Sequence, residues 1–308
     1  MASPPVDVEA EMKVIHERKP GLAANSYRTY RGSLKRLKMV SPSYEVAELT
    51  QYLSGLNNAP LARNLITPLL ILHPERYRGT FDELHRAAEK IRTNQRPSNA
   101  QRKNLTSMRE IKRMLRRMRE DIKTHKMMDR EFLSLKTPEK RLVIAFVSFT
   151  LLLDITMRND AASIKVAKTT AAANKDDSSN YFVISTGTLV LRKFKTARSF
   201  RNRGLLPLRL QPTKPTARVL AKYLRAFPTD WLFSLNGKSP LTKAQHSNIL
   251  TAHSFRYLGV RLGVNMLRHL VLSEFEKTNP SLNERKRQMK RMQQLSLETQ
   301  MSYAWVDE

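Results

Sequence analysis

An apolar run at residues 142–153 constrains the fold of this chain more than any other feature of its sequence. The run covers about twelve residues, whereas a helix that spans a membrane needs roughly 20. We therefore expect a helix buried inside a folded domain. Pro138 suits the first turn of that helix, because a backbone N–H has no partner within the helix at that position.

Short runs with a high β propensity follow the buried helix. They lie at residues 181–185 and 188–194, with Thr186 and Gly187 as the turn of a hairpin. Residues 205–210 are a candidate third strand. The pattern predicts a small antiparallel β-sheet.

Helical patterns occupy most of the remaining chain. In the N-terminal part we expect a bundle of about four helices. The first has Tyr27, Tyr30, Leu34 and Leu37 as its apolar stripe, and the others lie at residues 46–56, 61–72 and 81–91. After the sheet we expect helices at residues 213–227 and in four stretches beyond residue 233. The predicted class is mainly α with a small antiparallel β-sheet (α+β). A length of 308 residues suits roughly two domains.

The composition of the chain divides it into four parts. Residues 1–21 are expected to be a flexible N-terminus with a short helix that ends near Pro20. Residues 22–96 are expected to form a compact helical domain, and residues 97–136 a linker and a basic helix. Residues 137–308 are the second domain. The likeliest linker is the sequence TNQRPSNA at residues 93–100.

Positive charge is the outlying property of the composition. The chain has 55 Lys and Arg against 27 Asp and Glu, a net charge of +28. On a folded chain this charge favours a polyanion as partner, the alternative being a basic surface that only keeps the protein soluble. If that polyanion is DNA, the candidate contacts are Arg28, Arg31, Lys35, Arg36, Arg113, Arg117, Arg198, Arg201, Arg203, Lys286 and Arg287.

The basic helix expected at residues 107–126 has two interpretations. Its apolar positions recur at helical spacing, and its other faces carry many arginines. It is either a solvated amphipathic helix, or a helix that contacts phosphates or straps the two domains together.

Several classes of site are excluded or disfavoured by composition. The chain has no cysteine, so disulfides, thiolate catalysis and cysteine zinc sites are excluded. Its seven histidines lie far apart, which disfavours a histidine metal site. The N-terminus has no basic-then-apolar signal sequence.

Cleaving a phosphodiester without a metal ion needs four groups. One neutralises the phosphate charge, one is the nucleophile, one accepts the proton of the nucleophile, and one protonates the leaving 5′ oxygen. Arginine suits the first task because its fork binds two phosphate oxygens. Lysine suits the last because it can give up a proton. Tyr303, in SLETQMSYAWV at residues 296–306, is a candidate nucleophile.

Each candidate cation also has an ordinary structural interpretation. Arg158, in DITMRNDAASI just after the buried helix, is a candidate ion-pair partner of Asp154 or Asp160. Lys195 lies among many cations in RKFKTARSFRNRGLLPL, where a solvated charge is the ordinary interpretation. Arg268, in VNMLRHLVLSEF, lies close to the apolar face of a helix, so its partner is either a carboxylate or a phosphate.

The order of these motifs resembles a known family. MRNDAASI, then KT followed by a PL strand, then NMLRH, then SLETQMSYAWV resemble the catalytic domain of the tyrosine recombinases and phage-type integrases over residues 137–308. NSYRTYRGSLKRL is similar to the start of the helical core-binding domain that precedes it in that family. Residues 22–96 would then be the DNA-clamping domain.

The resemblance implies a role for each residue that matches the motifs. Arg158 and Arg268 match the two phosphate-binding arginines. Lys195 matches the hairpin lysine that acts as general acid, with Lys193 as the alternative. Tyr303 matches the nucleophile that forms a 3′-phosphotyrosine link. Because that link conserves the bond energy, strands are rejoined without ATP, and no cofactor or metal is expected.

Two positions depart from the family pattern. Asn265 stands where the family commonly has His, and Gln294 where it has His or Trp. Asn265 can hydrogen-bond a phosphate but cannot take a proton from tyrosine, whose ordinary pKa is about 10. His269, one turn further along, is a candidate auxiliary group. The form of NMLRH is similar to recombinase-like proteins of large insect DNA viruses, including the baculovirus very late factor group.

We therefore expect a site-specific DNA recombinase or integrase. Its partner is double-stranded DNA, on which it would assemble as a homo-tetramer, within the cell and in the host nucleus if the source is a virus of eukaryotes. Only five residues follow Tyr303, so assembly is arranged without a long tail or is weak without DNA. The alternatives are a type IB topoisomerase and a non-catalytic DNA-binding or genome-processing factor on the same fold.

Overall fold

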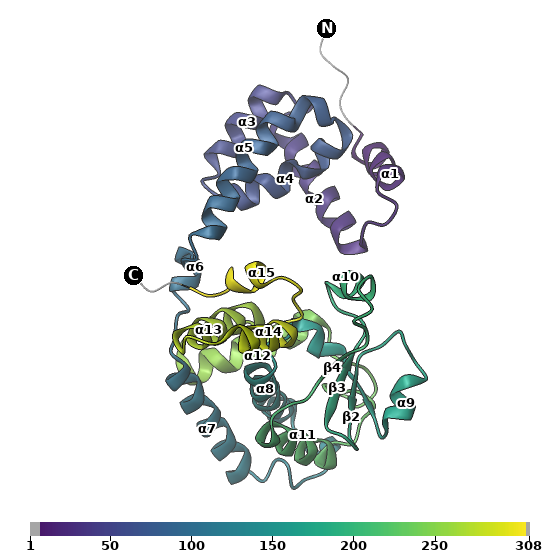
Figure 1. Ribbon diagram of the computed structural model, residues 1–308, viewed down its shortest axis with the longest axis vertical. Coiled ribbons are helices and arrows are strands. Elements are labelled where there is room, and N and C mark those ends of the chain that lie inside the picture. The colour runs from purple at the N-terminus through teal and green to yellow at the C-terminus, as the bar shows by residue number, and fades with distance from the viewer. Residues whose placement is uncertain (1–6, 306–308) are drawn as a thin grey trace. The chain divides into compact units, whose positions relative to one another are not determined.

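The computed structural model describes residues 7–305, except for the side chain of Leu133. The chain divides into two compact units, Met1–Asn94 and Gln95–Glu308. The division falls inside residues 93–100, the stretch whose composition indicated a linker. Figure 1 labels the α-helices of both units and strands β2, β3 and β4.

Helices make up the described part of the first unit. They are α1 (Val8–Arg18), α2 (Ala24–Val40), α3 (Val46–Gly55), α4 (Ala59–Leu72) and α5 (Pro74–Thr93). The helix expected at residues 81–91 is longer than predicted, because Pro74 occupies its first turn, where proline is favoured.

Helix α1 is the short helix expected within residues 1–21, and it ends at Arg18, two residues before Pro20. The side chain of Asp7 caps this helix by accepting a hydrogen bond from the backbone N–H of Glu9 at 2.9 Å. Met12 and Ile15 are fully buried in the same core as Leu34 of α2. The segment is therefore held by burial of its apolar face, and only residues 1–6 of the expected flexible part lie outside the described residues.

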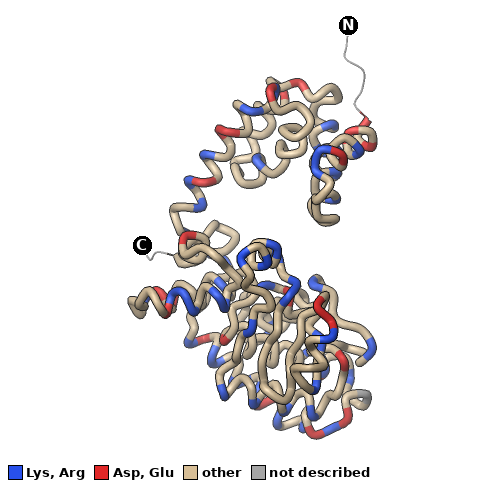
Figure 2. The backbone as a smooth tube through the Cα atoms, turned by 45° about the vertical axis from the view of Figure 1, so that its right-hand side comes forward, with Lys and Arg blue, Asp and Glu red and all other residues tan. Residues whose placement is uncertain are grey.

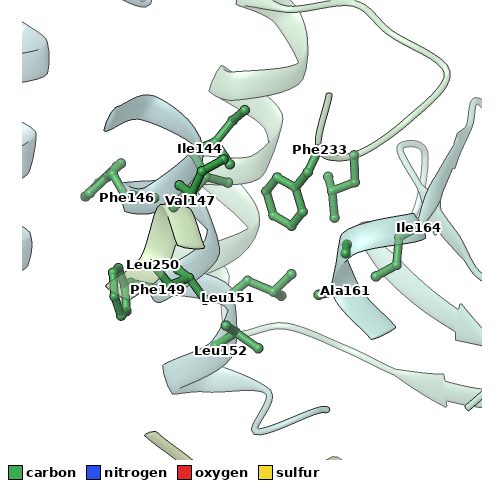
Figure 3. Close-up of a cluster of buried hydrophobic side chains, with 14 of the residues drawn as sticks. Ile144, Phe146, Val147, Phe149, Leu151, Leu152, Ala161, Ile164, Phe233 and Leu250 are labelled. Carbon is green, nitrogen blue, oxygen red and sulfur yellow. The ribbon is translucent and has the colours of Figure 1, made fainter. Parts of the chain in front are cut away.

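The second unit is built around α8 (Thr137–Asp154), which confirms the buried helix predicted from the apolar run. Helices α7 (Met108–Thr124), α11 (Lys214–Ala226), α12 (Lys243–Leu258) and α13 (Val264–Lys277) pack against it. Figure 3 shows side chains of α8 in one cluster with Ala161, Ile164 and Phe233. Because α8 is enclosed, the segment that leaves its C-terminal end is anchored to the core.

A small four-stranded sheet covers one side of this core. Its strands are β1 (Lys165–Ala167), β2 (Tyr181–Val183), β3 (Thr188–Leu191) and β4 (Leu208–Leu210), in the order β1-β2-β3-β4. The pairs β2–β3 and β3–β4 are antiparallel, and Gly187 in the predicted turn has φ +65°. Strand β1 pairs with β2 in parallel, so the sheet is mixed and not purely antiparallel. The predicted class, mainly α with a small sheet, is confirmed.

Strand β3 ends earlier than predicted, at Leu191 and not at residue 194. The side chain of Asn180 explains the difference, because its Oδ1 accepts hydrogen bonds from the backbone N–H groups of Arg192 and Lys193, both at 2.8 Å. These two N–H groups therefore donate to a side chain and do not extend the hydrogen-bond pattern between β3 and its neighbouring strands. The chain after β3 becomes a loop that contains Lys195 and leads into the short helix α10 (Ala197–Arg201).

The remaining helices of the second unit are short or peripheral. They are α6 (Asn99–Arg102), α9 (Thr170–Asn174), α14 (Leu282–Arg291), α15 (Leu297–Met301) and the 3-10 turns η1 (Phe132–Ser134) and η2 (Asn159–Ser163). The basic helix expected at residues 107–126 is α7, and its apolar residues Ile111, Met114 and Met118 are buried in the core shared with α8. Within residues 7–305, no helix has the length and apolar character that crossing a membrane requires.

Candidate active site

Arg158 lies four residues after the end of α8, on the turn that begins η2. The next residue, Asn159, fixes this turn: its Nδ2 donates to the backbone oxygen of Lys243 at 2.8 Å, and its Oδ1 accepts from His246 Nδ1 at 2.6 Å. His246 Nε2 in turn accepts from the hydroxyl of Ser148 in α8 at 2.9 Å. A buried network thus ties the Arg158 turn to two core helices.

The two carboxylates that were candidate partners of Arg158 are engaged elsewhere. Asp154 forms an ion pair with Arg291 at 2.6 Å, and Asp160 pairs with Lys243. The Nε of Arg158 is buried and has no hydrogen-bond partner among the described residues. The ordinary interpretation of Arg158, an ion pair with a neighbouring aspartate, is therefore wrong.

Arg268 is the largest fully buried side chain of the described chain. It lies on α13, and its Nη1 and Nη2 donate to the backbone oxygens of Thr156 at 2.9 Å and Met292 at 3.2 Å. Burial lowers the pKa of its guanidinium to about 10, and the nearby charge of Arg158 acts in the same direction. The group still carries its charge at neutral pH, so the site contains a buried cation that donates to neutral carbonyl oxygens and not to a carboxylate.

Gln294 brings the two arginines together. In the amide orientation that satisfies its hydrogen bonds, the side-chain oxygen accepts from Arg158 Nη2 at 3.0 Å and from Arg268 Nη2 at 3.1 Å. The residue is buried, with 2% of its surface exposed. Two like charges thus converge on one acceptor, an arrangement that suits the binding of an anion with several oxygens.

Tyr303 lies beside this pair of arginines. The Cζ atom of Arg268 is 4.7 Å from the centroid of the Tyr303 ring, a cation–π contact. His269 Nδ1 donates to the backbone oxygen of Tyr303 at 2.8 Å. The ring of His269 stacks on Trp305 with a centroid distance of 4.6 Å and an angle of 3°. The described part of residues 296–306, which excludes Val306, is therefore held against α13.

The structure does not bring the other predicted catalytic residues into this hydrogen-bonded cluster. Asn265 is exposed in the first turn of α13. Lys195 is exposed on the loop before α10, and Lys193 is exposed at a hollow that Asp160 also lines. Burial lowers the pKa of His269, and its Nδ1 is occupied by the Tyr303 carbonyl. His269 thus has a clear structural contact with the Tyr303 segment.

Sequence reasoning missed Gln293, the neighbour of Gln294. Gln293 is fully buried with φ +57°. Its side-chain oxygen accepts from the backbone N–H of Arg158 at 3.2 Å, and its backbone oxygen accepts from the hydroxyl of Thr196 at 2.7 Å. No local pattern predicts either contact, because both join segments about 100 or more residues apart.

The predicted DNA contacts are all exposed on the surface. They lie on α2 in the first unit and on α7, α10 with its following loop, and α14 in the second, and Figure 2 shows Lys and Arg spread over both units. Three of them also have partners within the protein: Arg31 pairs with Glu9, Arg36 donates to Tyr52, and Arg117 donates to the backbone of Tyr257. Within residues 7–305, no group of three or more His, Asp or Glu is placed to hold a metal ion.

Comparison with known proteins shows what kind of fold this is. No protein-family model and no curated protein sequence matches the chain. Among solved structures, it is similar to a lambda integrase (75-356) dimer bound to a COC′ core site, at 13% identity and a TM-score of 0.59, over 98% of this chain and 97% of that one. It is also similar to a lambda integrase tetramer bound to a Holliday junction, at 14% identity and a TM-score of 0.56, over 98% and 78% of the two chains.

The chain therefore has the fold of the tyrosine recombinases and integrases. The likeness covers nearly the whole chain, so it includes the helical first unit as well as the second. At this identity it shows the fold alone, and the roles of individual residues depend on the contacts described above.

Proposed function

We propose that this chain cleaves and rejoins double-stranded DNA through Tyr303, as a site-specific recombinase or integrase. One observation carries the proposal: Arg158 and Arg268, from segments 110 residues apart, both donate to Gln294, and Tyr303 packs on Arg268. Two cations and a tyrosine from the family motifs therefore meet at one place, although nothing in their spacing along the chain requires it.

The reaction follows from the chemistry of these groups. The Tyr303 oxygen gives its proton to water and forms a bond to phosphorus while the bond from phosphorus to the 5′ oxygen breaks, which leaves a 3′-phosphotyrosine link and a 5′-hydroxyl. The guanidinium groups of Arg158 and Arg268 stabilise the negative charge that develops on the phosphoryl oxygens. Lys195 donates the proton that the leaving 5′ oxygen takes up. Rejoining is the reverse reaction, with a 5′-hydroxyl as the nucleophile.

Gln294 has a role in this scheme that differs from that of His or Trp. Its buried side-chain oxygen accepts from both arginines and so holds the two guanidinium groups together where a phosphate would bind. Asn265, exposed at the start of α13, offers its amide to a phosphate oxygen. It has no basic nitrogen, so it cannot accept the tyrosine proton.

Exposed cations supply the affinity for DNA in this proposal. Contacts with phosphates dominate such binding and make it strongly dependent on salt. We further propose that the chain assembles as a tetramer on its target and acts where that DNA is held. The nucleus of an infected cell is the place if the NMLRH motif does mark a relative of the insect-virus proteins.

A second candidate function, DNA binding without cleavage, is favoured by Asn265, which stands where the family commonly has a histidine. A factor that binds DNA on this fold without cutting it would keep the exposed cations and would have no need of a proton acceptor for Tyr303. A type IB topoisomerase would share the tyrosine chemistry and would relax supercoils without exchanging partners.

Trapping of a covalent intermediate separates these functions. The DNA sequence that the full chain protects would be selected from random duplexes and made with a nick beside the cut position, so that the cleaved fragment is lost and the link persists. We expect a protein–DNA adduct that Tyr303→Phe abolishes. Tyr223→Phe is the matched control, since this buried tyrosine of the second unit should lose its hydroxyl without effect on the adduct.

Three results would redirect the assignment. Intact binding with no adduct on any nicked duplex would support the non-catalytic factor. An adduct that survives in Tyr303→Phe would exclude Tyr303 as the nucleophile. Relaxation of supercoiled DNA without any preferred sequence would support the topoisomerase.

A further inference from the structure

The segment 292–294 contacts three parts of the proposed active site at once. The backbone oxygen of Met292 accepts from Arg268, and the side chain of Gln294 accepts from both arginines. Between them, Gln293 accepts from the backbone N–H of Arg158 and from the hydroxyl of Thr196. Thr196 is the residue directly after Lys195, so this one segment connects both arginines with the lysine loop.

Gln293 adopts a backbone conformation that this contact pattern helps to explain. Its φ of +57° is in the left-handed region, which a residue with a Cβ atom enters only at a cost in free energy. Such conformations persist where the surrounding structure holds them. Here the fully buried side chain is fixed on the Arg158 turn, and the backbone oxygen is directed at Thr196.

Lys195 is held on both sides by its neighbours, while its own side chain is exposed. On one side, the ring of Phe194 packs edge-on against Phe200 with a centroid distance of 5.1 Å. On the other side, Thr196 donates to Gln293 at 2.7 Å. The backbone of Lys195 is therefore tied, through Thr196, to the segment that holds the arginines, and its side chain stays exposed.

Lys193, the alternative lysine, has a different anchor. Its backbone N–H and oxygen both bond to the side chain of Asn180, at 2.8 and 2.7 Å. Its side chain lines a hollow with Asp160 and Lys243, whose charges pair with each other. This anchor belongs to the sheet, with no hydrogen bond to the segment that holds the arginines.

We propose that Gln293 and Thr196 are positioning residues that hold Lys195, and not Lys193, as the proton donor to the leaving 5′ oxygen. The inference rests on the proposed function, which supplies the cleavage reaction. The hydrogen bond between Thr196 and Gln293 sets the distance between the lysine loop and the Arg158 turn. The acid and the phosphate-binding arginines therefore reach the same phosphodiester together.

Two substrates distinguish acid positioning from a general loss of activity. One is the nicked duplex with its natural 5′ oxygen at the cut position, and the other has sulfur in place of that bridging oxygen. A thiolate leaves without being protonated, because a thiol has a much lower pKa than an alcohol. A defect confined to the general acid therefore slows cleavage of the oxygen substrate and spares the sulfur substrate.

Thr196→Val in the full chain removes the hydroxyl and keeps the shape of the side chain. We expect it to form the adduct roughly 10- to 100-fold more slowly on the oxygen substrate, part of the ~100- to 10,000-fold that a general acid contributes. On the sulfur substrate its rate should stay within about 3-fold of wild type. Thr196→Ser, which restores the hydroxyl, should recover the oxygen rate. Lys195→Ala should show the same pattern with a larger loss, and Lys193→Ala should keep the wild-type ratio of the two rates.

The outcomes that overturn the inference are distinct from those that overturn the proposed function. Equal rates for Thr196→Val and wild type on the oxygen substrate would show that the hydrogen bond positions nothing. An equal loss on both substrates would show a structural defect, and sulfur rescue of Lys193→Ala would make Lys193 the acid. If the wild-type chain forms no adduct on either substrate, the proposed function itself is wrong and the inference falls with it.

Discussion

Acidification is expected to destabilise the second unit through His246. This side chain is fully buried between α8 and the Arg158 turn, where Nδ1 donates to Asn159 and Nε2 accepts from Ser148. Burial lowers the pKa of His246 from 6.5 to about 4. The folded unit therefore holds the neutral imidazole in a pH range where the unfolded chain binds a proton.

The sign and size of the effect follow from this difference. The unfolded state binds more protons below pH 6.5, so the free energy of unfolding falls as the pH drops from about 6.5 towards the folded pKa. At ~1.36 kcal/mol per pH unit, the loss for His246 approaches about 3 kcal/mol near pH 4. Burial also lowers the pKa values of His253 and His269, which adds a loss of the same sign.

Tryptophan fluorescence is a suitable assay, because both tryptophans, Trp231 and Trp305, belong to the second unit. Urea unfolding would be measured between pH 7.5 and pH 4 for wild type and for His246→Gln. The variant should be less stable at pH 7.5 and should lose less stability on acidification, by up to about 3 kcal/mol. His125→Gln, at an exposed histidine of the same unit, should keep the wild-type pH dependence.

The reasoning about His246 would be refuted by parallel curves of stability against pH for wild type and His246→Gln. Direct titration of the imidazole by NMR gives an independent check. A pKa near 6.5 for His246 in the folded chain would show that burial does not hold the ring neutral.

Three further predictions concern the site, the DNA contacts and the core. Asn265→His should raise the rate of adduct formation, by about 10-fold if it supplies a general base; an unchanged rate would mean that another group already accepts the tyrosine proton. Arg198→Gln should weaken binding to all duplexes alike and reduce the slope of log affinity against log salt by roughly 1, as measured by fluorescence anisotropy, and an unchanged slope would remove Arg198 from the phosphate contacts. Phe149→Ala in α8 should lower the free energy of unfolding by about 3–5 kcal/mol. Phe255→Ala, at a phenylalanine that is 52% exposed, should lower that free energy much less in the same urea experiment. Equal losses for the two variants would contradict the burial described for α8.

Local sequence patterns predicted the elements that carry their own signal. The apolar run predicted α8, and the hairpin residues predicted β2, β3 and the turn at Gly187. Strand β1 was missed because three residues around Val166 form a strand only through their parallel pairing with β2, a partner that local periodicity does not reveal. The short helix α1 was expected, but its burial was not, because that burial depends on packing against α2 and α4.

The candidate site shows the same limit. The family motifs pointed to Arg158, Arg268 and Tyr303, and the structure brings these three residues together. Sequence alone did not reveal which carboxylate pairs with which cation. Asp154 forms its ion pair with Arg291, which lies 137 residues further along the chain. The contacts of Gln293 were also hidden, since a backbone φ and a hydrogen bond across the fold leave no trace in composition or spacing.

The C-terminal end of α8 has an electrostatic consequence for the candidate site. The aligned peptide dipoles of a helix place a partial negative charge of roughly half an electron at its C-terminus. Arg291 donates to the backbone oxygen of Asp154 at 2.8 Å, and Arg268 to that of Thr156 just beyond the helix at 2.9 Å. The macrodipole therefore stabilises the guanidinium groups of Arg291 and Arg268, and under the proposed function this arrangement would need little reorganisation to bind a phosphate. The apolar run that forms the core of the second unit thus also contributes to the electrostatic field at the candidate site.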